Sequence, residues 1–281
     1  MKGFIKMIIA GSVILGIGIV VLVFALGLNH WQLDEDYEMK DYECAEENTT
    51  LDIDFSAGTL DINYYDGDKI KIEYPESETW TASISEVNGT LSFATEHKRK
   101  WNNFSNWFSK IPTTKIWIPQ GDIMNVDLNM NAGTVKLADG GYGNLDITMN
   151  AGTFSTGEVD CKKLSVKLNA GTISAQKIDS VEEASIKMNA GSINIHYLVC
   201  PSIVSKLSAG SLNISKLQTA SVDVNLSAGS VKLVMTGAKS DYDIDVDKSA
   251  GSCNISNQRG TKGMSIKAGI SAGSLTVKFE S

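Results

Sequence analysis

The stretch "VDLNMNAGTVKL", residues 126–137, contains the four-residue word "NAGT", and this word decides the fold. Close variants of it recur through the chain as "SAGT", "NAGS" and "SAGS". After a first interval of 75 residues, successive words are 19 to 22 residues apart, which is a spacing typical of a solenoid. The central glycines of the words are Gly58, Gly133, Gly152, Gly171, Gly191, Gly210, Gly229, Gly251 and Gly273.

Apolar and polar residues alternate on both sides of each word. Val126, Leu128 and Met130 precede the word quoted above, and Val135 and Leu137 follow it. Alternation with a period of two predicts strands with one buried face, and no helical spacing interrupts it. The sequence therefore predicts an all-β fold, a β-helix or solenoid of about nine coils with 19 to 22 residues per coil. Residues 119–281 hold most of these repeats.

Each word is expected to form the corner between two strands. Glycine adopts positive φ without steric cost, and the alanine before it keeps the corner narrow. The residue before that alanine is Asn or Ser, and coils stacked about 4.8 Å apart would place these side chains in a hydrogen-bonded ladder. Thr or Ser after the glycine could form a second ladder. The predicted main ladder consists of Asn131, Asn150, Asn169, Asn189, Ser208, Ser227, Ser249 and Ser271.

The long first interval indicates one coil that carries a large insertion. Within residues 51–118 the first word has the same alternating frame, and further strand-like segments follow it. Asn88-Gly89 is a strong signal for a hairpin turn. The end of a solenoid needs a cover for its exposed edge. Residues 51–118 are therefore predicted to form the first coil and a β-hairpin cap.

The N-terminus contains 22 uncharged residues, 7–28, which as a helix would span roughly 33 Å of a bilayer. Lys2 and Lys6 precede this stretch, so residues 1–6 are expected in the cytoplasm and the rest outside. A cleaved signal peptide is the alternative, although the apolar run is longer than usual for one. Residues 29–50 are acidic and lack periodicity, which predicts a stalk.

A basic and aromatic segment follows the acidic part of the chain. Residues 31–96 contain 18 acidic residues and three lysines, whereas residues 97–118 contain five Lys or Arg and no acid. Interleaved cations and rings suit an anionic membrane or a wall polymer. Alternatively, the rings pack onto the cap and the cations are merely solvated. The candidate contact residues are Lys98, Arg99, Lys100, Trp101, Phe104, Trp107 and Phe108.

The sequence predicts no catalytic, metal or cofactor site among its remaining reactive side chains. Cys161 and Cys200 lie two coils apart, about 10 Å, which is too far for a disulfide, so they are predicted to be small core residues. Cys44, in the expected stalk, could pair with another chain. Four aspartates alternate along one strand and could hold a cation, but an exposed strand face is the favoured interpretation. These are Asp241, Asp243, Asp245 and Asp247.

The apolar N-terminus followed by "SAGT", "NAGT" and "SAGS" words between alternating strands resembles a bacterial β-strand-repeat family of unknown function, described as candidate adhesins. The resemblance covers roughly residues 48–281. It implies a cell-envelope β-solenoid, often linked to envelope-stress signalling in Gram-positive bacteria, and it supplies no catalytic residues.

Together, these patterns predict a non-catalytic, single-pass membrane protein whose extracellular rod serves adhesion or stress sensing. A scaffold that assembles end to end and a polysaccharide-binding or polysaccharide-active β-helix remain alternatives. The expected partners are the membrane, through the N-terminal helix, and cell-wall polymer, envelope proteins or a second copy. The net charge of −8 argues against nucleic acid, and no cofactor is expected.

Overall fold

The computed structural model describes residues 36–45, 47–98, 111–121 and 123–280. One compact unit, Tyr37–Arg99 and Ile111–Ser281, contains every strand, and the other, Met1–Asp36 and Lys100–Lys110, lies almost wholly outside the described residues. Among the described residues, no helix is long and apolar enough to cross a membrane. Residues 7–28, predicted as a transmembrane helix, are not among them.

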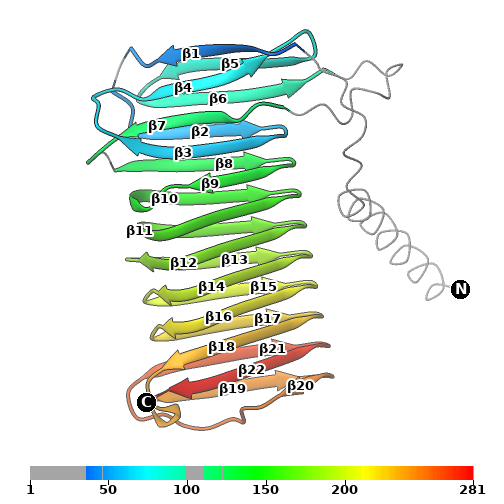
Figure 1. Cartoon of the computed structure of the whole chain (residues 1–281). Coiled ribbons are helices and arrows are strands. Elements are labelled where there is room, and N and C mark those ends of the chain that lie inside the picture. The colour runs from blue at the N-terminus through cyan, green and yellow to red at the C-terminus, as the bar shows by residue number, and fades with distance from the viewer. Residues whose placement is uncertain (1–35, 46, 99–110, 122, 281) are drawn as a thin grey trace, which may run out of the picture. The chain divides into compact units, whose positions relative to one another are not determined.

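The strand-bearing unit is an all-β solenoid, as the repeat predicts, and each coil places one strand before its corner and one after it (Figure 1). The strands before the corners form what we call the leading stack, in which neighbours pair in parallel. Its members are β2 (Thr50–Phe55), β8 (Met124–Met130), β10 (Gly140–Met149), the second half of β11 (Thr153–Leu168), β13 (Glu183–Met188), β15 (Ser202–Leu207), β17 (Ser221–Leu226), β19 (Tyr242–Lys248) and β21 (Met264–Ile270).

The strands after the corners form the trailing stack, which is also parallel. Its members are β3 (Thr59–Tyr65), β9 (Thr134–Leu137), the first half of β11, β12 (Thr172–Ser180), β14 (Ser192–Val199), β16 (Ser211–Gln218), β18 (Ser230–Thr236), β20 (Ser252–Cys253) and β22 (Ser274–Glu280).

The alternating apolar residues fill the space between the two stacks. Ile147, Val166 and Ile186 occupy one register position on consecutive strands, and all three are buried. Truncating such a buried aliphatic side chain to alanine typically costs about 2–5 kcal/mol. The side chains of each coil pack between the two stacks and against those of the adjacent coils, so the alternating residues of the repeat form the core.

The order of the last two coils differs from the order of the sequence. The repeats follow one another along the sequence, but β17 pairs with β21 and β18 pairs with β22. The coil of β19 and β20 comes earlier in the chain, yet it pairs only with β21 and β22 and forms the end of the stack (Figure 1). The sequence does not predict this order, because all coils have nearly the same corner word and could pair in the same register with any neighbour.

Residues 254–262 cover part of the edge that this rearrangement leaves at β19. Gln258 and Ile244 exchange backbone N–H···O bonds of 2.9 and 3.0 Å, and the Asn257 side chain accepts the Val246 N–H at 2.7 Å. A 3-10 helix, η2 (Lys239–Asp241), leads into β19. The extra residues of the two longest coils are therefore used to close the end of the rod. Lys248, at a core register opposite Ile270, is exposed there.

The insertion after the first coil closes the other end. β6 (Thr90–His97) and β7 (Thr114–Pro119) add parallel strands to β2 and β3, and β5 (Trp80–Val87) and β4 (Lys71–Glu76) then pair antiparallel with them. The β5–β6 turn has positive φ at Asn88 and Gly89, 52° and 73°, as an Asn-Gly hairpin requires.

The expected acidic stalk is wrong for its last part. Residues 38–43 form β1 (Glu38–Glu43), which pairs antiparallel with β4, and Cys44 after it is 1% exposed. Cys44 is thus not available to pair with another chain. The segment has an exposed outer face and only a few partly buried side chains, so its sequence shows little apolar periodicity.

Candidate functional site

The corner asparagines form a ladder of side-chain amides. Asn150 Nδ2 donates to Asn131 Oδ1 at 2.7 Å, and the next two steps, Asn169 to Asn150 and Asn189 to Asn169, are both 2.6 Å. The ladder stops at Asn189: within the described part of the chain, no side-chain hydrogen bond joins the serines that follow. Those serines are Ser208, Ser227, Ser249 and Ser271. The amides thus connect coils to one another, as a structural element would.

Serine hydroxyls after the corner form isolated hydrogen bonds, each of which joins one pair of coils. Ser211 Oγ donates to Ser192 Oγ at 3.1 Å, and Ser252 Oγ donates to Ser274 Oγ at 3.0 Å. The second pair joins the two coils whose order is exchanged. These polar side chains of the repeated word therefore form hydrogen bonds to neighbouring coils.

The corner glycines are required on two counts. All nine have positive φ, between 87° and 137°. In addition, a Cβ built on Gly152 would lie 2.1 Å from the Gly133 carbonyl oxygen, and eight of the nine glycines meet a neighbouring corner backbone at 2.1 to 2.7 Å in this way. The exception is Gly58, whose neighbour is the Ile111 side chain at 3.3 Å.

The structure describes residues 97–98 and 111–118 of the basic aromatic segment, and Lys98 is among them. Lys98 is exposed, and its N–H donates to the Thr79 carbonyl oxygen at 2.7 Å. The rest of the candidate contact set lies outside the described residues, namely Arg99, Lys100, Trp101, Phe104, Trp107 and Phe108.

The four aspartates do not all lie on one exposed strand face, because Asp241 is buried in η2 before β19 begins. Two of them hold the end cover. Asp241 Oδ2 lies 3.0 Å from Lys262 Nζ, and Asp243 Oδ1 accepts the Gly260 N–H at 2.9 Å. Asp245 and Asp247 are exposed. Across the described ranges, no three His, Cys, Asp or Glu side chains are grouped so that they could hold a metal ion.

The cysteines are free, and three of them are buried. Burial raises the pKa of Cys161 and of Cys200 to about 11, and that of Cys44 to about 12. Ser180 lies between Cys161 and Cys200 in the stack, so these two belong to the core, as expected. Thiols with raised pKa values are poor nucleophiles at neutral pH.

A hollow on the outer side of the cap is the best candidate for a binding site. Its volume is about 550 Å³, and we call it the cap hollow. Volumes of 300–1,000 Å³ are typical of ligand pockets. It lies where β1, β4, β7 and the end of β3 meet, and it is lined by Asp41, Tyr42, Glu43, Tyr65, Lys71, Ile72 and Trp117.

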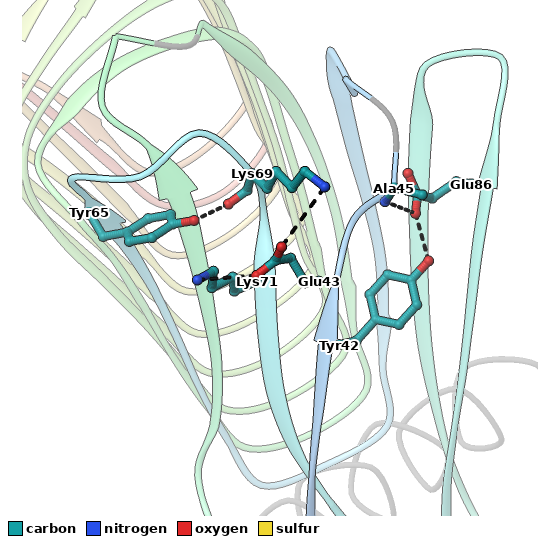
Figure 2. Close-up of polar contacts among 7 residues, drawn as sticks. All are labelled: Tyr42, Glu43, Ala45, Tyr65, Lys69, Lys71 and Glu86. Carbon is teal, nitrogen blue, oxygen red and sulfur yellow. Dashed lines mark hydrogen bonds and ion pairs between the residues drawn. The ribbon is translucent and has the colours of Figure 1, made fainter.

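Cross-strand register brings these residues together. Glu43 is opposite Lys71, and Lys71 is opposite Trp117, so an acid, a base and an indole form one row across three strands. Lys71 Nζ lies 3.2 Å from Glu43 Oε2 and 5.5 Å from the centre of the Tyr65 ring (Figure 2). This side of the hollow therefore combines the half-buried rings of Tyr65 and Trp117 with the Glu43–Lys71 ion pair.

Side-chain contacts fix the positions of these groups. The Tyr65 hydroxyl donates to the Lys69 carbonyl oxygen, and Lys69 Nζ lies 3.9 Å from Glu43 Oε1 (Figure 2). Lys115 Nζ lies 5.8 Å from the centre of a Trp117 ring and 3.5 Å from Glu73. Tyr65 and Trp117 thus each have a lysine beside the ring.

Glu86 ties β1 to the hairpin behind the hollow. Its carboxylate accepts hydrogen bonds from the Tyr42 hydroxyl at 2.6 Å and the Ala45 N–H at 2.9 Å (Figure 2). The bond to Glu86 is the main reason that the pKa of Tyr42 is raised to about 12. The sequence predicted a cap within residues 51–118, which contain Tyr65, Lys71 and Trp117, but it missed Asp41, Tyr42 and Glu43, because β1 was predicted to be a stalk.

Known proteins share this architecture. The model of the Toastrack DUF4097 family matches residues 48–281. A candidate adhesin from Bacteroides fragilis NCTC 9343 has a similar structure, with 14% sequence identity and a TM-score of 0.50 over 88% of this chain and 99% of that one. A candidate lipid-binding protein from Parabacteroides distasonis ATCC 8503 has 16% identity and a TM-score of 0.49 over 89% and 100%. No curated protein sequence matches the chain. Identities this low show similarity of fold alone.

Proposed function

Because the chain belongs to the Toastrack DUF4097 family, whose domain has no known function, we propose that it is a non-catalytic, adhesin-like protein of the bacterial cell envelope. The proposal is that residues 7–28 hold it at the membrane and that its solenoid presents the cap hollow to envelope glycans. The observation that carries it is the pairing of Tyr65 and Trp117 with Glu43 and Lys71 in one hollow.

The chemistry of the hollow suits a sugar. Aromatic rings offer flat apolar surfaces to the C–H faces of sugar rings, while charged groups at their edges bond hydroxyls. Glu43 can accept hydrogen bonds from hydroxyls, and Lys71 can donate them. The ion pair between them holds both in place without a ligand. The resemblance of the fold to a candidate adhesin agrees with a binding role.

A second feature supports a presenting role. Strands β1, β4 and β5 extend past the first coil at one end of the stack, and residues 254–262 cover part of the edge at the other. The part of β19 that remains uncovered carries Asp245, Asp247 and Lys248, and charges on an edge strand oppose pairing with another chain. These features favour a single rod over an end-to-end scaffold.

The test is binding of the full-length chain to purified cell-wall glycan, measured by co-sedimentation. We expect Tyr65→Ala with Trp117→Ala to weaken binding by about tenfold, as loss of aromatic anchors commonly does. Tyr197→Ala is the matched control, because Lys216 Nζ lies 4.6 Å from that ring on a strand far from the cap. Equal binding by all three proteins would refute the role of the hollow.

Membrane attachment is tested separately. Fractionation of cells that express the full chain should place it with membranes, and deletion of residues 7–28 should release it. Release without loss of glycan binding would separate the anchor from the hollow. An intact chain that fractionates away from membranes would contradict this part of the proposal.

A further inference from the structure

Three lysines form a column on the outer face of the leading stack. Lys167 on β11 is opposite Lys187 on β13, and Lys187 is opposite Lys206 on β15. All three are exposed. Adjacent strands lie about 4.8 Å apart, so three ammonium groups extend from equivalent points along the axis of the stack.

Within the part of the chain that the structure describes, the column lysines are not held in salt bridges. None of the three lysines forms an ion pair with a residue in the described ranges. The flanking rows on the same strands contain Ser165, Ser185 and Val204 on one side and Asn169, Asn189 and Ser208 on the other. The three lysines face one another, although like charges directly opposite one another destabilise a sheet, and the nearest acids in register are Asp146 and Asp223, which lie opposite Ser165 and Val204 at the two ends of the first row.

Two other lysines of the molecule show the contrast, because they face acids. Lys115 lies between Glu73 and Asp61 in register, and Lys162 lies 3.6 Å from Glu182. The column is bounded by Thr148 at one end and Asn225 at the other. The three lysines therefore form a short row of adjacent positive charges in a chain whose net charge is −8.

A polar hollow adjoins the column. Its volume is about 320 Å³, and its lining includes Lys187, Lys206, Asn189, Ser208, Asn225 and Ser227. It begins where the amide ladder ends: Asn189 Nδ2 donates to Asn169, while within the described residues Asn189 Oδ1 and the hydroxyls of Ser208 and Ser227 have no side-chain partner. These exposed groups can bond ligand hydroxyls.

We infer that this column binds a linear acidic polysaccharide that lies along the stack. A polymer with repeated negative charges can engage all three ammonium groups, and the Asn and Ser rows suit its hydroxyls. A membrane or a single-stranded nucleic acid would call for apolar or aromatic side chains beside the cations, and the flanking rows offer only Val204. The inference concerns a surface separate from the cap hollow and does not depend on it.

The experiment measures binding of the full-length chain to polygalacturonate and, in parallel, to neutral dextran. The column variant carries Lys167→Gln, Lys187→Gln and Lys206→Gln. The control carries Lys136→Gln, Lys232→Gln and Lys278→Gln, which changes the net charge equally at exposed positions on the trailing stack. Melting curves of both variants establish that they fold.

For polygalacturonate, we expect the column variant to bind about tenfold more weakly and the control to change by less than about twofold. Dextran should not distinguish the proteins. Equal losses in both variants would show a response to net charge and overturn the inference, as would unchanged binding by the column variant. Vesicles of phosphatidylglycerol serve as a further arm. If the wild type binds these but not polygalacturonate, and the column variant loses vesicle binding, the inference is also overturned.

Discussion

Gly273 stacks directly on Gly229, although Gly251 lies between them in the sequence. A Cβ on Gly273 would lie 2.7 Å from the Gly229 carbonyl oxygen, and a Cβ on Gly251 would lie 2.1 Å from that of Gly273. The backbone bonds agree, since the Ser274 N–H donates to the Gly229 carbonyl oxygen and the Ser252 N–H to that of Gly273, at 2.9 and 2.8 Å. The coil of Gly273 therefore lies between the coils of Gly229 and Gly251, which both come earlier in the sequence.

Cross-linking can test this order. Asp223, Lys267 and Asp245 occupy one register position on β17, β21 and β19. Adjacent strands suit the Cα separation of a disulfide, whereas strands two apart, at about 10 Å, do not. We expect Asp223→Cys with Lys267→Cys to form a disulfide on mild oxidation, identified by peptide mass spectrometry. Asp223→Cys with Asp245→Cys should stay reduced, and the opposite pattern would restore the order of the sequence.

Substitution of a corner glycine should be severe. Gly171→Ala places a side chain at φ 114° and 2.2 Å from the Gly152 carbonyl oxygen, so we expect a loss of more than about 3 kcal/mol in the free energy of unfolding. Gly121→Ala is the control, because φ is 94° there but no atom lies within 4 Å of the added carbon. It should cost only about 1 kcal/mol. Denaturant titration measures the free energy of unfolding of each variant. Equal losses would show that close stacking of the corners does not contribute to stability.

Breaking the amide ladder should have a moderate effect. Asn169 donates one hydrogen bond and accepts another, so Asn169→Leu removes both and should cost about 1–2 kcal/mol. Ser227→Ala, at the equivalent corner position beyond the ladder, should change the free energy of unfolding by less than about 0.5 kcal/mol. Thermal melting compares the two. A neutral Asn169→Leu variant would mean that the backbone bonds alone hold the corners.

The cysteines should differ in their reaction with iodoacetamide. Cys161 and Cys200 are buried with pKa values near 11, so at about pH 8 few of them are thiolates, and Cys253 is only partly buried at the end of the stack. We expect the native chain to be alkylated at Cys253 alone. A raised pKa lowers the thiolate fraction below that pKa, so labelling of Cys161 and Cys200 should rise only as pH approaches about 11 or the chain unfolds. Rapid labelling of Cys200 in the native state would contradict the structure.

The sequence predicted the strands and the corners of the coils, which are the features that the repeat determines. Alternating residues such as Ile186 and Met188 assign the strands, and the word assigns the corner, because both depend on local stereochemistry. It could not predict which coil adjoins the coil of Gly229, since the candidates have nearly the same corner word. Nor could it place Glu43 beside Lys71, because that contact depends on an antiparallel pairing across an irregular insertion.

Both ends of this solenoid are built out of chain order. The first coil lies between strands that come later, β6 and β7 on one side and β8 and β9 on the other, and the last coil lies between two earlier ones. A duplication or deletion of one repeat would preserve both closures only among the consecutive coils between β8 and β18. The length of the solenoid can thus change during evolution by gain or loss of coils in its middle, while the strand order at the two ends stays the same.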